Sequence, residues 1–349
     1  MICIGFYLRD LVSFKFSIFD NGSTNAIAAR AYLPIEPSRS EPAVGKKHWC
    51  IVAPKYLPKN TRKHFYHFPH ASEILLPCWS WFMEQGATDN CGYFFHPQFE
   101  LSSWPIDLIK SMGCEIQFAK DVADITPDGL VTTLSPHDIQ FIPNLYLLRP
   151  RLEYIRYLND ASHAHALRRK IVSDEHILSK KGPGKNLQIG MIQRDSSRRI
   201  GNFDEIKEAI RSAIPSVDIF TTDFKFDSMK EQAEWFATKD VVVAAHGAAL
   251  TNSIFITQGT IVMQLYPPGY FWQSLDPLIE QSGGRAIQWY EKGKNPSVVS
   301  ATSTREEFDL AGKATFSPPV DEVVKPILYT LGIERPTNQL MKKLYGDFV

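Results

Sequence analysis

The 349-residue sequence has no excess of charge of one sign and no long apolar run. Its 38 basic and 38 acidic side chains give a formal net charge of zero, so no overall field attracts nucleic acid or an anionic membrane. The apolar start of the chain ends at Arg9, too early for a membrane span. We therefore expect no nucleic-acid partner, no membrane span in this chain and a soluble protein.

Cysteine is scarce, and no two cysteines form a Cys-x-x-Cys pair. The five cysteines all lie in the first third of the chain: Cys3, Cys50, Cys78, Cys91 and Cys114. This number and spacing argue against a structural zinc site. They favour small buried side chains and leave open a disulfide between two of them.

The sequence also lacks the common phosphate-binding motifs. It contains neither Gly-x-Gly-x-x-Gly nor a Walker A sequence, which disfavours dinucleotide-dependent oxidoreductases and P-loop enzymes. It contains no Asp-x-Asp triplet either. A diphosphate would therefore be held by protein cations rather than by a chelated metal, and we expect neither a metal nor another cofactor.

The most informative stretch is 240–268, where an apolar run meets a turn of small residues. Val241–Ala245 has the length and branching of a strand buried on both faces. His246–Ala249 follows as a turn, then Leu250–Ile256 reads as a helix and Ile261–Leu265 as a second strand. Such a turn, at the carboxyl end of a strand and the start of a helix, favours an anionic ligand. A tight turn without a ligand is the alternative.

A second polar loop is predicted to lie at the same edge of the sheet. Leu187–Ile192 reads as a strand, and Arg194, Arg198 and Arg199 follow it directly. Guanidinium groups form planar, charge-assisted contacts with phosphate oxygens. The two loops together predict a diphosphate clamp, although Arg198 and Arg199 could instead be a solvated pair at a helix entry.

The chain as a whole predicts an α/β protein with two compact domains. A turn-rich hinge at 180–185 separates residues 1–180 from a regular β-α alternation over 181–320. Residues 321–349 are expected to form terminal helices, with packing on the first domain as one arrangement. The basic stretch 149–178 is interpreted as a solvated helix that links the domains.

A cluster of histidines and an acid precedes the apolar segment near residue 75. His67, His70 and Glu73 match no zinc-ligand spacing, but they could handle protons at a cleft. The alternative is that they cap or cover a helix that begins near Pro69. Asp89 is a further, more distant candidate.

On these residues the chain resembles the family-61 glycosyltransferases over roughly residues 185–290. The pattern comprises an Arg that closes a strand, an Arg before Ile and Asn, and a block close to His-Gly-Ala-Gly-Leu-Thr-Asn. It is carried here by Ile192–Arg194, Arg198–Ile200, Asn202, Glu231–Gln232, Val241–Asn252, Phe255, Gly259–Thr260 and Leu265–Pro267. Upstream, Tyr66–His67 and Glu73–Pro77 resemble the family's histidine–acid–Leu-Leu-Pro segment.

The resemblance implies a GT-B fold, with two Rossmann-like domains facing across a cleft: 1–180 on the acceptor side and 181–320 for the nucleotide sugar. It implies inverting, metal-independent transfer of xylose, N-acetylglucosamine or arabinose from a UDP-sugar to a glycan or glycopeptide acceptor. The implied donor-binding residues are Arg194, Arg198, Arg199, His246, Gly247, Ala248, Ala249, Leu250, Thr251, Asn252 and Gln264. Ala249 replaces a usual glycine, and Gln264 stands where an acid is common, which alters the expected ribose contact.

Inverting transfer also needs a general base on the acceptor hydroxyl. We expect Glu73 in this role, with His67 and His70 as alternatives. Two other functions stay open: a GT-B epimerase or hydrolase that consumes a nucleotide sugar, and a non-catalytic nucleotide- or glycan-binding protein. The compartment also stays open between the cytoplasm, in a microbial or viral setting, and the lumen of the Golgi or ER behind an anchor.

Overall fold

The structure is a computed structural model that describes residues 48–52, 68–95, 101–118, 157–270, 275–290 and 310–334. Mixed α/β architecture with parallel sheets is confirmed. Among the described residues, no helix is both long and apolar enough to cross a membrane. Residues 335–349 of the predicted terminal helices lie outside these residues, as does His67.

The larger sheet contains five parallel strands in the order β6-β4-β7-β8-β9. Its strands are β4 (Leu187–Ile192), β6 (Val217–Thr222), β7 (Val241–Ala245), β8 (Ile261–Leu265) and β9 (Arg285–Trp289). The chain passes from β4 to β6 on one side and then returns to β7 on the other side. The strand order therefore reverses between β4 and β7, where open α/β sheets bind ligands at their carboxyl edge.

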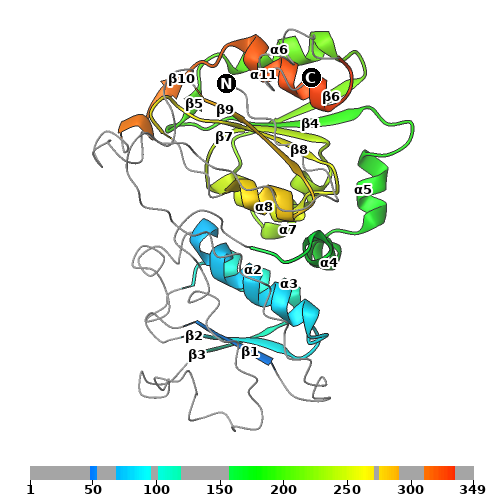
Figure 1. Ribbon diagram of the computed structural model, residues 1–349, viewed down its shortest axis with the longest axis vertical. Coiled ribbons are helices and arrows are strands. Elements are labelled where there is room, and N and C mark those ends of the chain that lie inside the picture. The colour runs from blue at the N-terminus through cyan, green and yellow to red at the C-terminus, as the bar shows by residue number, and fades with distance from the viewer. Residues whose placement is uncertain are drawn as a thin grey trace, which may run out of the picture.

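Helices cover both faces of this sheet (Figure 1). On one face lie α6 (Phe203–Ala213) and α11 (Val320–Thr330), and on the other lie α7 (Met229–Ala237) and α8 (Asp276–Gln281). β7 and β8 are buried throughout, as their apolar sequences predict. A short parallel pair, β5 (Arg199–Ile200) with β10 (Thr315–Phe316), lies beside α6.

The segment after β7 forms a helix, but of the 3-10 type: η3 (Ala248–Phe255). The side chain of Asn252 donates from Nδ2 to the carbonyl of Ala249 at 3.1 Å. Side chains that bond to nearby backbone groups compete with the α-helical pattern, and a segment of eight residues has little cooperativity to oppose them. The prediction of a helix is confirmed, and its tighter winding was not predicted.

The smaller sheet lies in the N-terminal part, with parallel strands in the order β1-β2-β3. It consists of β1 (His48–Val52), β2 (Cys91–Phe95) and β3 (Glu115–Phe118), covered by α2 (Phe68–Glu84) and α3 (Ser103–Met112). Two disulfides join these elements, Cys50–Cys78 and Cys91–Cys114. The option of a disulfide thus holds for both pairs, and their cysteines are buried as well.

One continuous apolar core joins the N-terminal helices to the larger sheet. α2 and α4 (Ala161–Ile171) pack on η3, and α3 and α4 pack on α7. The prediction of a solvated linker helix is therefore wrong for α4. Its apolar stripe, with Ala164 and Leu167 fully buried, is hidden in the sequence by the three basic residues at its end. The next helix is α5 (Asp174–Lys180).

The C-terminal helix packs differently from one of the expected arrangements. Val323, Val324, Ile327 and Leu328 of α11 join a second core with β4, β7, β8 and α6. The described part of the C-terminal segment thus covers the larger sheet rather than the N-terminal domain. The physical reason is the apolar stripe of α11. It packs on the face of the larger sheet that α6 covers only in part. The boundary near residue 180 stays a prediction.

Candidate functional site

The loop after β4 is closed by a single glutamine. Gln193 donates from Nε2 to the carbonyl of Ile200 at 2.8 Å and accepts from the Ile200 amide at 3.1 Å. Inside this ring, Arg194 donates from Nε to the Ser197 carbonyl at 2.7 Å and from Nη2 to Ser197 Oγ at 3.0 Å. These bonds fix the Arg194 guanidinium at the point where the strand order reverses.

Arg198 is held by Tyr270, which follows β8. Its Nη1 donates to the Tyr270 hydroxyl at 3.0 Å, and its guanidinium lies 5.0 Å from the centre of that ring. The backbone of Arg198 has φ 55°, a left-handed conformation that is uncommon for a residue with a side chain. Such backbone strain is frequent at ligand sites, where the surrounding structure maintains it.

Gly247 brings the two arginines together with the turn after β7. A Cβ at this position would lie 2.5 Å from Arg194 Nη1 and 3.7 Å from Arg198 Cζ. A side chain at 247 would therefore have to displace the Arg194 guanidinium. Because Gly247 has φ 167°, its backbone is extended, and space rather than conformation requires the glycine.

The positive charge of this site has no counter-ion within the part of the chain that the structure describes. Among the described residues, no carboxylate forms an ion pair with Arg194 or Arg198, and the buried Arg198 Nε has no acceptor. Burial, together with the charge of Arg198, lowers the pKa of Arg194 from its usual value, although an arginine stays charged. Two adjacent, half-buried guanidinium groups that pair with no described carboxylate are chemically suited to an anion.

Arg199 does not share this position. It lies on β5, is exposed, and pairs through its backbone with β10. Arg198 and Arg199 were both candidates to act beside Arg194, and the structure places Arg198 there. Lys225, further out, forms ion pairs with Asp195 and Asp223 and so is already neutralised.

His246 is buried beside the arginines and is uncharged. Its ring stacks on Tyr266 at 4.8 Å, and its Nδ1 lies 3.2 Å from Gln264 Oε1. The pKa of His246 is lowered to about 3, mainly by burial and also by the charges of Arg198 and Arg194, while the hydrogen bond to Gln264 acts in the opposite direction. Because Gln264 Oε1 is an acceptor, Nδ1 carries the proton and Nε2 is left as an acceptor.

Gln264 continues a chain of buried polar groups away from the arginines. It is fully buried, and its Nε2 donates to Asp276, which also accepts from Gln288. Burial raises the pKa of Asp276 to about 7. The oxygen and the nitrogen of the Gln264 side-chain amide are therefore both bonded to protein groups. Of these partners, His246 is the one that lies beside the arginines.

The start of η3 completes the site. Ala248 is exposed and Ala249 half-buried, whereas Leu250, Thr251 and Asn252 are fully buried. Thr251 Oγ1, Asn252 Oδ1 and Ser253 Oγ have no partner among the described residues. Buried polar atoms without partners are rare in native structures and are often satisfied by a ligand or by water.

The residues predicted to act as the base lie on a different element. Glu73 is half-buried on α2, which packs on η3, whereas Asp89 is exposed in the turn after α2. His70 belongs to α2, but its side chain is not among those described. The role of Glu73 stays a prediction. Within the described residues, no group of three or more His, Cys, Asp or Glu side chains is arranged to hold a metal.

Sequence reasoning missed Tyr270, Tyr266 and Asp276. The tyrosines flank Pro267 and Pro268, which the sequence marks only as the end of a strand. A pair of tyrosines around that strand end, facing a loop rich in arginine, is the signal that could have indicated them. Asp276 carries no such signal, because only the fold brings it to Gln264.

Comparison with known proteins identifies one family model and two relatives. Residues 52–263 match the family model of Glycosyltransferase 61. The chain is 26% identical over 153 residues to the EGF domain-specific O-linked N-acetylglucosamine transferase of Xenopus laevis, covering 40% of this chain and 29% of that protein. It is 27% identical over 143 residues to the beta-1,2-xylosyltransferase XAX1 of Oryza sativa subsp. japonica, covering 41% and 22%.

The chain thus spans less than a third of the length of either relative. The family match extends from the end of β1 to the middle of β8 and includes both arginines, His246 and Gly247. It covers more than half of the chain, so the resemblance noted from the sequence is confirmed. This chain belongs to the Glycosyltransferase 61 family.

Proposed function

We propose that this chain transfers a sugar, with inversion and without a metal, from a UDP-sugar to a hydroxyl of a glycan or glycopeptide acceptor. The observation that carries the proposal is the pair Arg194 and Arg198, two guanidinium groups without a carboxylate beside Gly247. Xylose, N-acetylglucosamine and arabinose are the candidate sugars. A GT-B arrangement of two domains is part of the proposal.

The site is suited to the charge that develops on a departing nucleoside diphosphate. Arg194 and Arg198 supply fixed positive charge, and the start of η3 supplies backbone amides. The neutral His246 presents Nε2 as an acceptor for a ligand hydroxyl. Removal of a single donor of this kind typically lowers kcat about 10² to 10³-fold.

The acceptor would approach from the side of α2. In the proposal, Glu73 takes the proton of the acceptor hydroxyl, with His67 and His70 as alternatives on the same segment. A half-buried carboxylate on a helix that packs on η3 is compatible with that role.

The test is a thermal-shift series with UDP and UDP-sugars, with and without EDTA, followed by an assay of transfer to an acceptor. At a hundredfold excess over Kd, a bound ligand stabilises the fold by about 2.7 kcal/mol. We expect UDP to raise Tm, EDTA to change nothing, and Arg194→Ala to abolish the shift. Arg211→Ala is the matched control, because Arg211 is exposed and paired with Glu208 at 2.6 Å.

The outcomes separate the candidate functions. Transfer of the sugar to an acceptor supports the proposal, whereas UDP-sugar consumption without transfer supports an epimerase or hydrolase. Binding without any turnover supports a non-catalytic protein. A shift with another nucleotide but with no UDP compound would refute the proposed donor chemistry.

A further inference from the structure

A cavity lies beside the start of strand β4, at the opposite end of that strand from Arg194 and Arg198. It has a volume of about 320 Å³ and lies between α5, α7 and the edge strand β6. Its lining consists of His176, Lys180, Gln188, Phe220, Phe226, Glu231, Glu234, Trp235, Thr238 and Lys239. Gln188 is near the start of β4, and Arg194 follows its end, so the two sites are roughly 20 Å apart along the strand.

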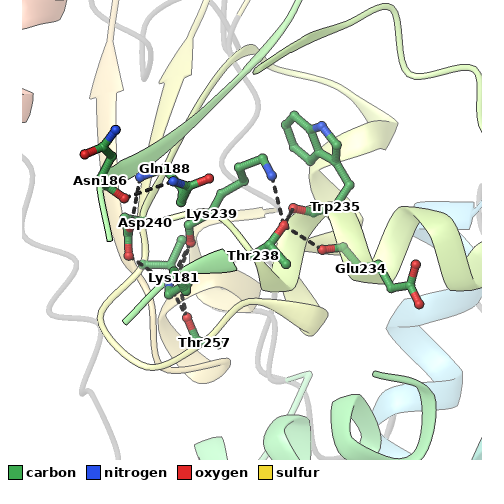
Figure 2. Close-up of polar contacts among 10 residues, drawn as sticks. Lys181, Asn186, Gln188, Glu234, Trp235, Thr238, Lys239, Asp240 and Thr257 are labelled. Atoms are coloured by element: carbon green, nitrogen blue, oxygen red, sulfur yellow. Dashed lines mark hydrogen bonds and ion pairs between the residues drawn. The ribbon is translucent and has the colours of Figure 1, made fainter. Parts of the chain in front are cut away.

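Lys239 is the central polar group of this cavity. Its side chain is 5% exposed, and its Nζ lies 4.4 Å from the centre of the Phe220 ring and 5.3 Å from that of Trp235. The ammonium donates to Thr238 Oγ1 at 2.9 Å (Figure 2). That single acceptor leaves two of its three N–H groups for another partner.

No protein carboxylate neutralises Lys239 among the described residues. The adjacent Asp240 instead pairs with Lys181 Nζ at 3.0 Å and accepts from the backbone N–H of Gln188 at 2.8 Å (Figure 2). The carboxylate of Glu234 points away from Lys239 in the same view and pairs loosely with Lys230 at 3.8 Å. A buried ammonium without a counter-ion is costly, and an anionic ligand would remove that cost.

The walls of the cavity are rigid and aromatic. Trp235 lies against Gly190 of β4, where a Cβ would be 2.5 Å from its ring, and its edge meets Phe224 and Phe236. Phe220 is 42% exposed, although it forms one wall. Exposed aromatic rings beside polar groups provide flat surfaces for the apolar face of a sugar ring.

Gln188 provides an acceptor at the floor of the cavity. Its Nε2 donates to the Asn186 carbonyl at 2.9 Å and to Asp218 Oδ2 at 2.9 Å. The orientation of the amide is thereby fixed, and no described residue donates to Oε1. With Glu231, Glu234, His176 and Lys180 around it, the cavity offers both donors and acceptors, as a polyhydroxylated ligand requires.

We propose that this cavity binds a hexuronic acid unit of a glycan, with the carboxylate on Lys239 and the sugar ring against Phe220 and Trp235. The sugar hydroxyls bond to Gln188 Oε1 and to the polar rim. The site is separate from the arginine site and does not depend on the proposed donor chemistry.

The test compares three ligands on the full chain by calorimetry, with intrinsic tryptophan fluorescence as a second readout. These are methyl glucuronide, methyl glucoside as the neutral match, and benzoate as a carboxylate without a sugar. We expect the glucuronide to bind at least about tenfold more tightly than the glucoside, which lacks the charge-assisted hydrogen bond to Lys239. It should also bind about tenfold more tightly than benzoate, which keeps the carboxylate but lacks the sugar hydroxyls. Lys239→Met should weaken glucuronide binding by about tenfold or more, and Phe220→Leu several-fold.

Lys230→Met is the matched control, since Lys230 lies on the same helix but is exposed. It should leave glucuronide binding unchanged, and a cooperative thermal unfolding transition in every variant would show that each remains folded. Equal binding of glucuronide and glucoside, or binding unaffected by Lys239→Met, overturns the role of the carboxylate. Equal binding of benzoate overturns the sugar, and no binding at millimolar concentration overturns the site.

Discussion

The two ends of strand β7 carry two buried bases that respond differently to the same environment. Lys239 precedes the strand and His246 follows it, and both side chains are at most 5% exposed. Burial lowers the pKa of both, to about 8 for Lys239 and about 3 for His246. At neutral pH the histidine is therefore neutral, whereas the lysine keeps its charge.

This difference explains what each end can bind. At the carboxyl end, positive charge comes from Arg194 and Arg198, which cannot lose their protons, and His246 serves as a neutral acceptor. At the amino end, one ammonium is enclosed by aromatic rings. Two guanidinium groups suit a multiply charged diphosphate, and a single ammonium in an apolar cavity suits a single carboxylate.

The largest expected effect concerns the carboxyl end. Gly247→Ala places a methyl group 2.5 Å from Arg194 Nη1 and must displace that guanidinium. Displacement of a catalytic contact by about 1 Å can lower the rate about a hundredfold. We expect a loss of this size in the rate of sugar transfer, with little change at the lysine cavity, where glucuronide affinity is the readout.

A double-mutant cycle tests whether the methyl group acts through Arg194. If it does, Gly247→Ala adds little to Arg194→Ala, because the displaced group is already absent. Additive losses would contradict this mechanism and would indicate that Gly247 contacts the ligand itself.

Much of the carboxyl end could be predicted from the sequence. The strand before His246 begins with a run of branched apolar residues, and the arginines follow a second predicted strand. Parallel strands place such loops at one edge, so local pattern and topology together bring them close. Tyr270 and Asp276 could not be predicted in this way, because their contacts join segments that only tertiary packing brings together.

The amino end and the N-terminal half were less predictable. Lys239 looks like an ordinary charge before a strand, and its burial depends on Phe220 and Trp235 from two other elements. The disulfide pairing could not be derived, because even four cysteines allow three pairings. The burial of α4 was missed since Arg168, Arg169 and Lys170 mask its apolar stripe.

A smaller effect is expected at the amino end, where Lys239→Met removes a buried, unpaired charge. The fall in the pKa of Lys239 from 10.5 to about 8 corresponds to a cost of roughly 3 kcal/mol for the buried charge, so we expect the variant to have a higher free energy of unfolding at pH 7. Lys239 has a lowered folded pKa, so between about pH 8 and 10.5 the unfolded chain binds more protons. The stability of the natural chain therefore rises with pH in this window.

The advantage of Lys239→Met should shrink over the same window, as measured by denaturant unfolding at several pH values. Lys230→Met, an exposed position on α7, should show no such convergence. Several other charged groups surround Lys239 and are common to both proteins: His176, Lys180, Lys181, Glu231, Glu234 and Asp240. A constant advantage at every pH would show that Lys239 has the same pKa in the folded and the unfolded chain. Burial would then not lower the pKa of Lys239 as it does that of His246, and the comparison of the two ends of β7 would fail.

The smallest effect separates His246 from Asp276 at the carboxyl end. The unfolded state binds the His246 proton between about pH 3 and 6.5, so this group removes stability as pH falls. Asp276 acts in the opposite direction: its folded pKa of about 7 removes stability as pH rises from 3.8. Between pH 4 and 6.5 the two contributions offset each other, each by at most about 1.4 kcal/mol per pH unit.

Two variants reveal this balance, each read as the slope of unfolding free energy against pH rather than as its level. His246→Gln leaves the Asp276 contribution alone, so stability should fall as pH rises. Asp276→Asn leaves the His246 contribution alone, so stability should rise with pH. Slopes that shift in the same direction would contradict the assignment of a neutral His246 beside the arginines, and with it the contrast between the two ends of β7.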